Sequence, residues 1–124
     1  WLLTENGVTA KLTALFGESG TVLKYGVASF LSANLINNIP MSILFCSVIA
    51  PLSDAARTAA VYATVIGSNL GAFLTPIGAL AGIMWSSILK KHGVRFHFLA
   101  FVRYGAMISI PTLAAALLLV GLLL

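Results

Sequence analysis

Two stretches decide how this chain folds: residues 32–40, with the sequence SANLINNIP, and residues 67–78, with the sequence GSNLGAFLTPIG. Each places asparagine together with glycine or proline inside sequence that is otherwise apolar enough for lipid. Because an unpaired polar group in hydrocarbon is costly, irregular backbone persists at that depth only where protein covers it or where it lines a cavity. Two such interruptions in one chain are typical of transporters that build a binding site from broken helices.

The composition is that of an integral membrane protein. Hydrophobic residues make up 60% of the chain and charged residues only 8%, whereas a soluble domain carries about 25% charged residues. Charged residues are absent from residues 25–53, 58–89 and 104–124, and each interval exceeds the roughly 20 residues that a membrane-spanning helix needs. The sequence therefore predicts an all-α integral membrane protein.

The net charge of +4 does not indicate nucleic-acid binding, because the positive charges are concentrated in one connection. Lys90, Lys91, Arg95 and Arg103 lie between two apolar runs. Cytoplasmic loops of membrane proteins carry such an excess of Lys and Arg. We therefore expect this connection in the cytoplasm and the C-terminus on the other side of the membrane.

We expect a short amphipathic helix over residues 9–16, lying along the membrane interface, and then a re-entrant hairpin over residues 21–50. The arms of the hairpin are residues 22–33 and 41–49, joined by a polar tip. The alternative is a single tilted helix over the same residues. Pro40 disfavours it, because proline removes a backbone hydrogen bond and restricts the preceding residue.

The second interruption predicts a discontinuous transmembrane helix over residues 55–91. Its halves are residues 55–66 and 79–90, separated by the break at 67–78, and a last span follows at 103–122. Two halves of this length together cross a hydrocarbon core of about 30 Å. Inverted-repeat transporters pair two such units, so we expect residues 1–124 to be the C-terminal half of a longer permease.

Both breaks would supply the groups of a binding site. A broken helix exposes carbonyl oxygens where its first half ends and N–H groups where its second half starts, here near Pro76. Side-chain amides and hydroxyls add donors and acceptors without a fixed anion, which suits a small neutral hydroxylated solute or a dehydrated cation. The candidate site residues are Asn34, Asn37, Asn38, Pro40, Ser68, Asn69, Gly71, Thr75, Pro76 and Gly78. The alternative role for the asparagines and glycines is close helix packing.

Other polar residues have simpler interpretations. Ser53 or Asp54 would cap the helix that follows, with Arg57 one turn later able to pair with Asp54. Pro111 would kink the last span, with Ser109 and Thr112 placed to help satisfy the freed carbonyl. A lone Cys46 permits no disulfide within the chain, and His92 and His97 belong to the solvated basic connection. The sequence predicts neither a cofactor nor a resident metal, and it lacks the paired acids or activated nucleophile of an enzyme.

The chain resembles the arsenite efflux permeases, a family within the ion transporter superfamily. The matching stretches are residues 37–40, 61–71 and 74–81, with Trp85, the turn at 90–94 and Tyr104-Gly105, and they cover most of residues 29–124. The resemblance implies extrusion of arsenite or antimonite across a prokaryotic inner membrane by a multi-pass protein, through proton antiport. It also implies that the hairpin tip and the broken helix face counterparts from the other repeat, and that a soluble ATPase subunit docks in some systems. Related permeases often carry Asp where this chain has Asn69.

A sodium/proton antiporter or a carboxylate carrier of the same superfamily is the alternative function. Carboxylate carriers would favour Ser-Asn-Thr motifs at both breaks, and this chain has none. A purely structural membrane subunit is a further alternative.

Overall fold

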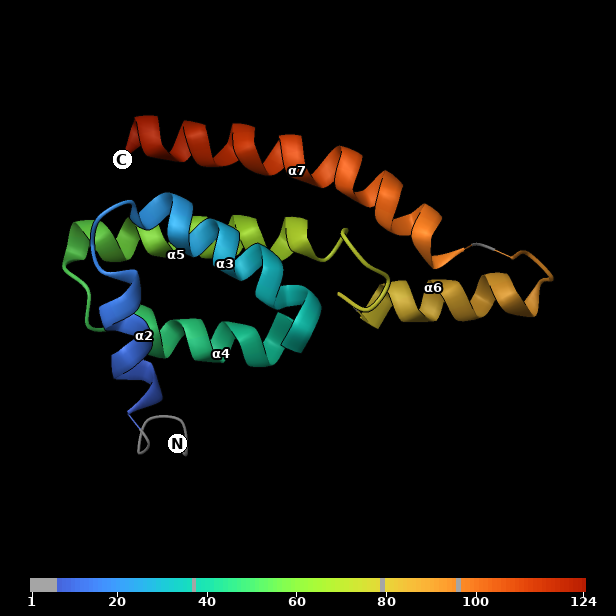
Figure 1. Cartoon of the computed structure of the whole chain (residues 1–124), viewed down its shortest axis with the longest axis horizontal. Helices are drawn as coiled ribbons and strands as arrows, with labels where there is room; N and C mark the ends of the chain where they lie inside the picture. The colour runs from blue at the N-terminus through green and yellow to red at the C-terminus, as the bar shows by residue number, and fades with distance from the viewer. Residues whose placement is uncertain (1–6, 37, 79, 96) are drawn as a thin grey trace.

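The computed structural model is all-helical over residues 7–36, 38–78, 80–95 and 97–124, which are the residues that the structure describes (Figure 1). Within these ranges it contains six helices and no strand, so the predicted all-α class is confirmed. The helices are α2 (Val8–Phe16), α3 (Thr21–Ile36), α4 (Asn38–Ile49), α5 (Asp54–Gly71), α6 (Leu80–Lys91) and α7 (Phe98–Leu123).

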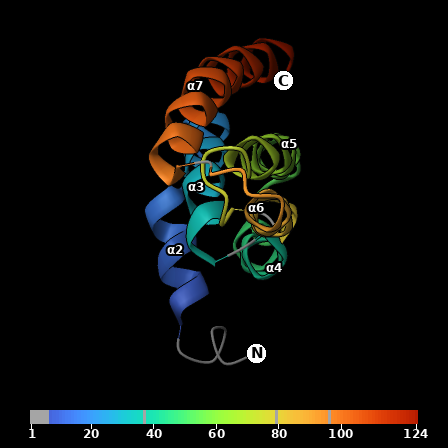
Figure 2. The same cartoon turned by 90° about the vertical axis from the view of Figure 1, so that its right-hand side faces the viewer.

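Helices α3 and α5 lie side by side at the centre and make the most extensive contact between two helices. They run parallel, because α4 returns the chain between them, whereas α7 runs antiparallel to both (Figure 1). In the perpendicular view, α4 and α7 lie on opposite sides of the α3–α5 pair (Figure 2). This parallel pairing brings the end of α3 beside the end of α5.

The contact between α3 and α5 depends on glycines that let the two backbones approach closely. A Cβ atom at Gly67 would overlap the carbonyl oxygen of Gly26, and one at Gly71 would overlap the carbonyl oxygen of Phe30. Glycines four residues apart on one helix face are the usual means of close packing between membrane helices. The predicted break at residue 67 is therefore wrong: α5 continues to Gly71, and neither glycine has a positive φ.

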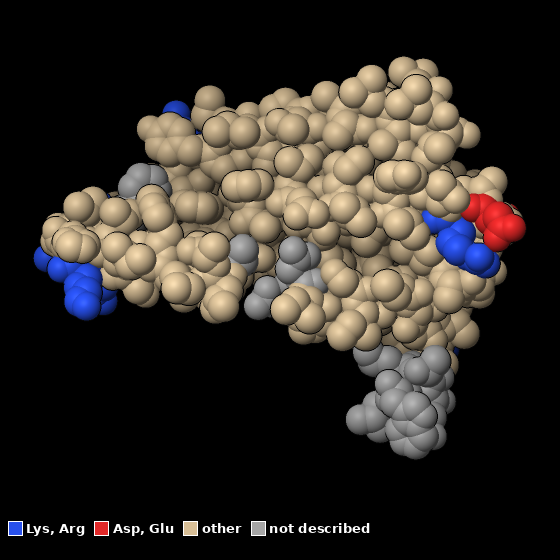
Figure 3. All heavy atoms as spheres, turned by 180° about the vertical axis from the view of Figure 1, so that it is seen from behind, with Lys and Arg blue, Asp and Glu red and all other residues tan. Residues whose placement is uncertain are grey.

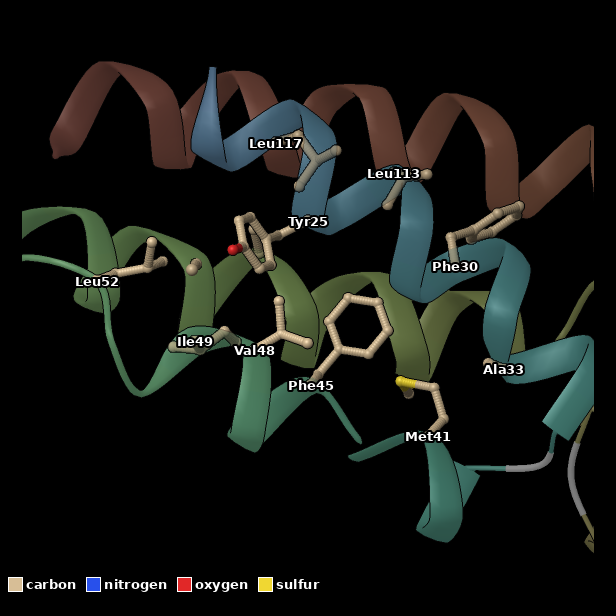
Figure 4. Packing of buried hydrophobic residues seen from close by; sticks show 12 residues of the cluster. Tyr25, Phe30, Ala33, Met41, Phe45, Val48, Ile49, Leu52, Leu113 and Leu117 are labelled. Carbon is tan, nitrogen blue, oxygen red and sulfur yellow. The ribbon is translucent and has the colours of Figure 1, made fainter. Parts of the chain in front are cut away.

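A hydrophobic core fills the space between the central pair and its neighbours (Figure 4). The aromatic rings of Phe16, Tyr25 and Phe45 pack together, with 5.0 Å between the Phe16 and Tyr25 centroids and 6.2 Å between those of Tyr25 and Phe45. From the opposite side α7 contributes Leu113 and Leu117, and the Leu117 side chain covers Gly26. The core thus joins α2, α3, α4, α5 and α7.

The hairpin differs in detail from the prediction. The alternative prediction of a single tilted helix over residues 21–50 is wrong. Two helices, α3 and α4, occupy these residues and contact each other. Helix α3 continues to Ile36 and α4 begins at Asn38, so both arms are longer than expected and the described residues of the predicted tip, 34–36 and 38–40, are helical. Pro40 falls in the first turn of α4, where its missing N–H would have no intrahelical acceptor.

The connection from α4 to α5 is held by charged groups. Of the two predicted capping residues, Ser53 occupies the N-cap position of α5 and Asp54 is the first residue of the helix, but the Ser53 hydroxyl makes no capping bond. Instead its backbone N–H donates to Glu18 Oε1 at 3.0 Å. Arg57 pairs with Asp54 at 3.1 Å, and its Nη2 also donates to the Leu52 carbonyl at 2.8 Å.

Helix α7 is longer than the predicted span at 103–122, because it begins at Phe98. Among the described residues it is the one helix long and apolar enough to cross a bilayer. Pro111 lies inside it as expected. The expected help from its neighbours is not found, because Thr112 Oγ1 donates to the Ile108 carbonyl at 2.7 Å and the buried Ser109 Oγ has no partner among the described residues.

Candidate functional site

The interruption between α5 and α6 occupies residues 72–78 and is made of hydrogen-bonded turns. Leu74 N donates to the Gly71 carbonyl at 2.9 Å, and Gly78 N donates to the Thr75 carbonyl at 3.1 Å. A discontinuity at this place was predicted, but it starts after Gly71 rather than at residue 67. The break therefore has a defined backbone conformation.

Two glycines on neighbouring helices let those helices press against this break. A Cβ atom at Gly82 of α6 would lie 2.5 Å from the Pro76 carbonyl oxygen. One at Gly105 of α7 would overlap the carbonyl oxygen of Phe73. The helices α6 and α7 thus contact the backbone of the turns at Pro76 and Phe73, while the side chains of Phe73 and Ile77 are exposed.

Asn34, near the end of α3, joins the first interruption to the second. Its Nδ2 donates to the Gly71 carbonyl and to the Phe30 carbonyl of its own helix, each at 3.0 Å. Its Oδ1 accepts a hydrogen bond from Thr75 Oγ1 at 2.8 Å, and Thr75 Oγ1 in turn accepts one from Gly78 N at 3.2 Å. Because both amide hydrogens are used, this side chain holds the break in place and has little capacity left for another ligand.

Ser68 and Asn69 do not belong to this network. The buried Ser68 hydroxyl donates to the Val65 carbonyl at 3.0 Å, and the exposed Asn69 amide donates to the same carbonyl at 2.7 Å. The two side chains therefore lie on different faces of α5. Asn69 is exposed and presents its amide at the surface of α5.

The remaining candidates are placed less directly. Asn37 and the side chain of Asn38 lie outside the described residues, and Pro40 is exposed on α4. Pro76 is half-buried in the turns, four residues before α6 begins at Leu80, so the prediction that it opens the second half of the helix is wrong. The first N–H groups of α6 therefore follow the break instead of starting within it.

Fewer carbonyl oxygens are free at the end of α5 than the sequence predicts. The carbonyls of Ser68, Leu70 and Gly71 accept hydrogen bonds from the following turn, at 3.2, 3.2 and 2.9 Å. A helix end of this kind is satisfied by its own turn. The site that remains consists of neutral amide and hydroxyl groups, and no charged residue occurs anywhere in residues 58–89.

Three hydroxyls are buried in the protein interior; sequence reasoning singled out only Ser109, and for a different role beside Pro111. Tyr25 of α3, Thr64 of α5 and Ser109 of α7 are buried, and their oxygen atoms have no hydrogen-bond partner among the described residues. For Thr64 and Ser109, the signal in the sequence is a polar residue within an otherwise apolar run. The sequence gives no such signal for Tyr25. These three hydroxyls, one each on α3, α5 and α7, are polar groups of the interior in addition to the Asn34 network.

The sequence is similar to a known protein family and to several curated proteins. Residues 7–124 match the family described as arsenical pump membrane protein. An arsenical pump membrane protein of Escherichia coli (strain K12) is 32% identical over 93 residues, which are 73% of this chain and 21% of that protein. A putative arsenical pump membrane protein of Bacillus subtilis (strain 168) is 33% identical over 69 residues, 54% of this chain and 16% of that protein.

A eukaryotic protein is similar at a comparable level. The P protein of Mus musculus is 34% identical over 82 residues, 62% of this chain and 10% of that protein. The chain spans 21% of the length of the first of these relatives and less of the other two. No solved structure matches it.

Proposed function

The chain belongs to the arsenical pump membrane protein family, and from this premise we propose that the protein extrudes arsenite or antimonite across a prokaryotic inner membrane by proton antiport. Its curated bacterial relatives include several named as arsenical pumps, which does not favour a sodium/proton antiporter or a carboxylate carrier. The transported species, the coupling ion and the multi-pass topology are parts of this proposal.

In the proposed arrangement, α3 and α4 form a re-entrant hairpin, α5 and α6 are the halves of a discontinuous helix, and α7 is the last span. The chain then supplies one half of an inverted-repeat transporter, facing a counterpart repeat. The support is the Asn34 network, which ties the hairpin end to the break through bonds to Gly71 and Thr75. Such a pair of interruptions meeting inside the protein is typical of this architecture.

One observation carries the choice of cargo: the groups that meet at the break are uncharged. Arsenite near neutral pH is the uncharged trihydroxide, which needs hydrogen-bond donors and acceptors rather than a counterion. Asn34, Thr75 and Gly78 already bond one another, so we assign them to shaping the site. The exposed amide of Asn69 and the N–H groups at the start of α6 are the groups that would contact cargo, with Asn37, Asn38, Pro40 and Pro76 contributing to the surrounding surface. Ser68 and Gly71 are buried, so we assign them to the packing of α5.

The test is arsenite and antimonite sensitivity of an efflux-deficient bacterial strain that expresses the full-length protein. We expect resistance from the unaltered protein and loss of resistance from Asn69→Ala, with membrane insertion and abundance unchanged. Ser47→Ala is the matched control, because the Ser47 hydroxyl is exposed and donates only to the Ile43 carbonyl of its own helix. Improved growth on sodium without resistance to arsenite would instead support the cation antiporter.

Proton coupling and partners require separate measurements. Uptake of arsenite into inverted vesicles should require an imposed proton gradient and should be abolished by a protonophore. If a soluble ATPase subunit of the system is added, ATP-dependent uptake without a proton gradient would show that it docks. Uptake that requires neither a proton gradient nor ATP would contradict secondary active transport.

A further inference from the structure

Positive charge gathers at one end of the molecule without acidic neighbours. Lys90 and Lys91 end α6, Arg95 follows in the connection, and Arg103 lies on α7, all of them exposed. The view from behind shows Lys and Arg at that end with no acidic atoms beside them, whereas the acidic atoms visible on this face lie with Lys or Arg atoms at the opposite end (Figure 3).

The two acidic residues that the structure describes are engaged at that opposite end, where α5 begins. Asp54 pairs with Arg57 at 3.1 Å, and Glu18 accepts the Ser53 N–H at 3.0 Å. In the described part of the chain, the α6–α7 end therefore carries positive charge that no carboxylate of the same end compensates.

The backbone after α6 folds the cations around a hollow. Gly93 has a φ of 75°, and the Val94 N–H donates to the Leu89 carbonyl at 2.9 Å while the Gly93 N–H donates to the Lys90 carbonyl at 3.1 Å. These two bonds form a Schellman cap, which reverses the chain sharply after a helix. Lys90 and Arg95 consequently line one hollow of about 660 Å³, together with Ser86, Leu89, Gly93 and Val94.

Aromatic side chains of α6 and α7 lie close to this end. Trp85 and Phe101 have ring centroids 5.8 Å apart, and Phe98 and Tyr104 expose 51% and 60% of their surface. Trp and Tyr gather at the interface between hydrocarbon and water, and the long apolar helix α7 starts here. The connection of residues 92–97 is too short to carry the cations far from that interface.

We propose that the α6–α7 end is a binding surface for anionic phospholipids, with the headgroup phosphate in the hollow that Lys90 and Arg95 line. Lys and Arg near a membrane surface attract anionic lipid, at about 1 kcal/mol for each charge. Lys90 and Lys91 follow Trp85 by five and six residues on α6, about 7–9 Å along the helix axis. They therefore lie beyond the aromatic residues, where headgroup phosphates lie outside the interfacial Trp and Tyr residues of a membrane protein.

The experiment uses the purified full-length protein in detergent, titrated separately with phosphatidylglycerol and phosphatidylcholine. Bound lipid is measured by native mass spectrometry. We expect the double variant Lys90→Gln/Arg95→Gln to lower the apparent affinity for phosphatidylglycerol by roughly thirtyfold and to leave that for phosphatidylcholine unchanged. The matched control, Lys11→Gln/Lys24→Gln, removes the same charge from the opposite end and should bind phosphatidylglycerol like the unaltered protein.

Two further arms separate the alternatives. The exchanged variant Lys90→Arg/Arg95→Lys keeps the charge and should retain phosphatidylglycerol binding, which guards against loss by misfolding. Inorganic phosphate at the lipid concentration should not compete; equal competition would show a site for free phosphate and overturn the lipid assignment. Undiminished lipid binding by the double variant, or an equal loss in the Lys11→Gln/Lys24→Gln control, would also overturn it.

Discussion

At the scale of single residues, two asparagines of similar sequence context have opposite environments. Asn34 is half-buried and bonds the Gly71 carbonyl and the Thr75 hydroxyl across the contact between α3 and α5. Asn69 is exposed and bonds only the Val65 carbonyl of its own helix. A hydrogen bond between membrane helices contributes about 0.6 kcal/mol on average, and up to about 1.7 kcal/mol. The two positions should therefore differ in stability when they are truncated.

We expect Asn34→Ala to lower the free energy of unfolding by about 1–2 kcal/mol, because the Thr75 hydroxyl loses its acceptor and the Gly71 carbonyl loses one donor. Thermal unfolding of the full-length protein in detergent measures this effect. Asn69→Ala should change stability by less than about 0.5 kcal/mol, as is usual for an exposed position. Equal destabilisation by both substitutions would contradict the assignment of Asn34 to shaping the break.

Thr75 offers a test of the hydroxyl alone. Thr75→Val keeps the shape of the side chain but removes the donor to Asn34 and the acceptor for Gly78 N, so we expect a loss of about 1 kcal/mol. Thr75→Ser keeps the hydroxyl and should recover most of that loss. If Thr75→Ser unfolds as readily as Thr75→Val, the methyl group and not the hydrogen bonds is what matters at this position.

At the scale of helices, the close contact between α3 and α5 decides where the second break begins. Gly67→Ala places a Cβ atom against the backbone of Gly26, which cannot move aside as a flexible side chain could. We expect a loss of about 1–3 kcal/mol from the forced separation, measured as a lower midpoint of thermal unfolding. Gly121→Ala is the matched control, since nothing lies within 4 Å of a Cβ there. A loss of similar size in the control would mean that helix contact is not the cause.

The same contact explains what could be predicted from the sequence. The amphipathic pattern of residues 9–16 predicts α2, and the charge-free intervals predict apolar helices around two interruptions. Gly67 and Gly71 were misassigned, because a glycine that permits close packing and a glycine that breaks a helix look alike without the neighbouring helix. The bond from Asn34 to Thr75 joins residues 41 positions apart. It exists because α3 and α5 run parallel, which no local pattern determines.

At the scale of the whole molecule, the separation of charge predicts orientation. The α6–α7 end carries Lys90, Lys91, Arg95 and Arg103. Short loops rich in Lys and Arg stay in the cytoplasm. With Val94→Cys introduced into a cysteine-free background, a membrane-impermeant maleimide should label inverted vesicles and not intact spheroplasts. Val94 suits the test because it is exposed and, unlike Gly93, needs no positive φ.

Labelling of Val94→Cys from the outside of spheroplasts would reverse the orientation and place the start of α7 in the periplasm. A second cysteine, Leu124→Cys at the far end of α7, gives the complementary result. Because α7 is long enough to cross the hydrocarbon core, the two positions should be labelled from opposite sides. Labelling of both positions from the same side would mean that α7 does not span the membrane. The proposed topology of α3 to α6, which takes α7 as the last span, would then be contradicted as well.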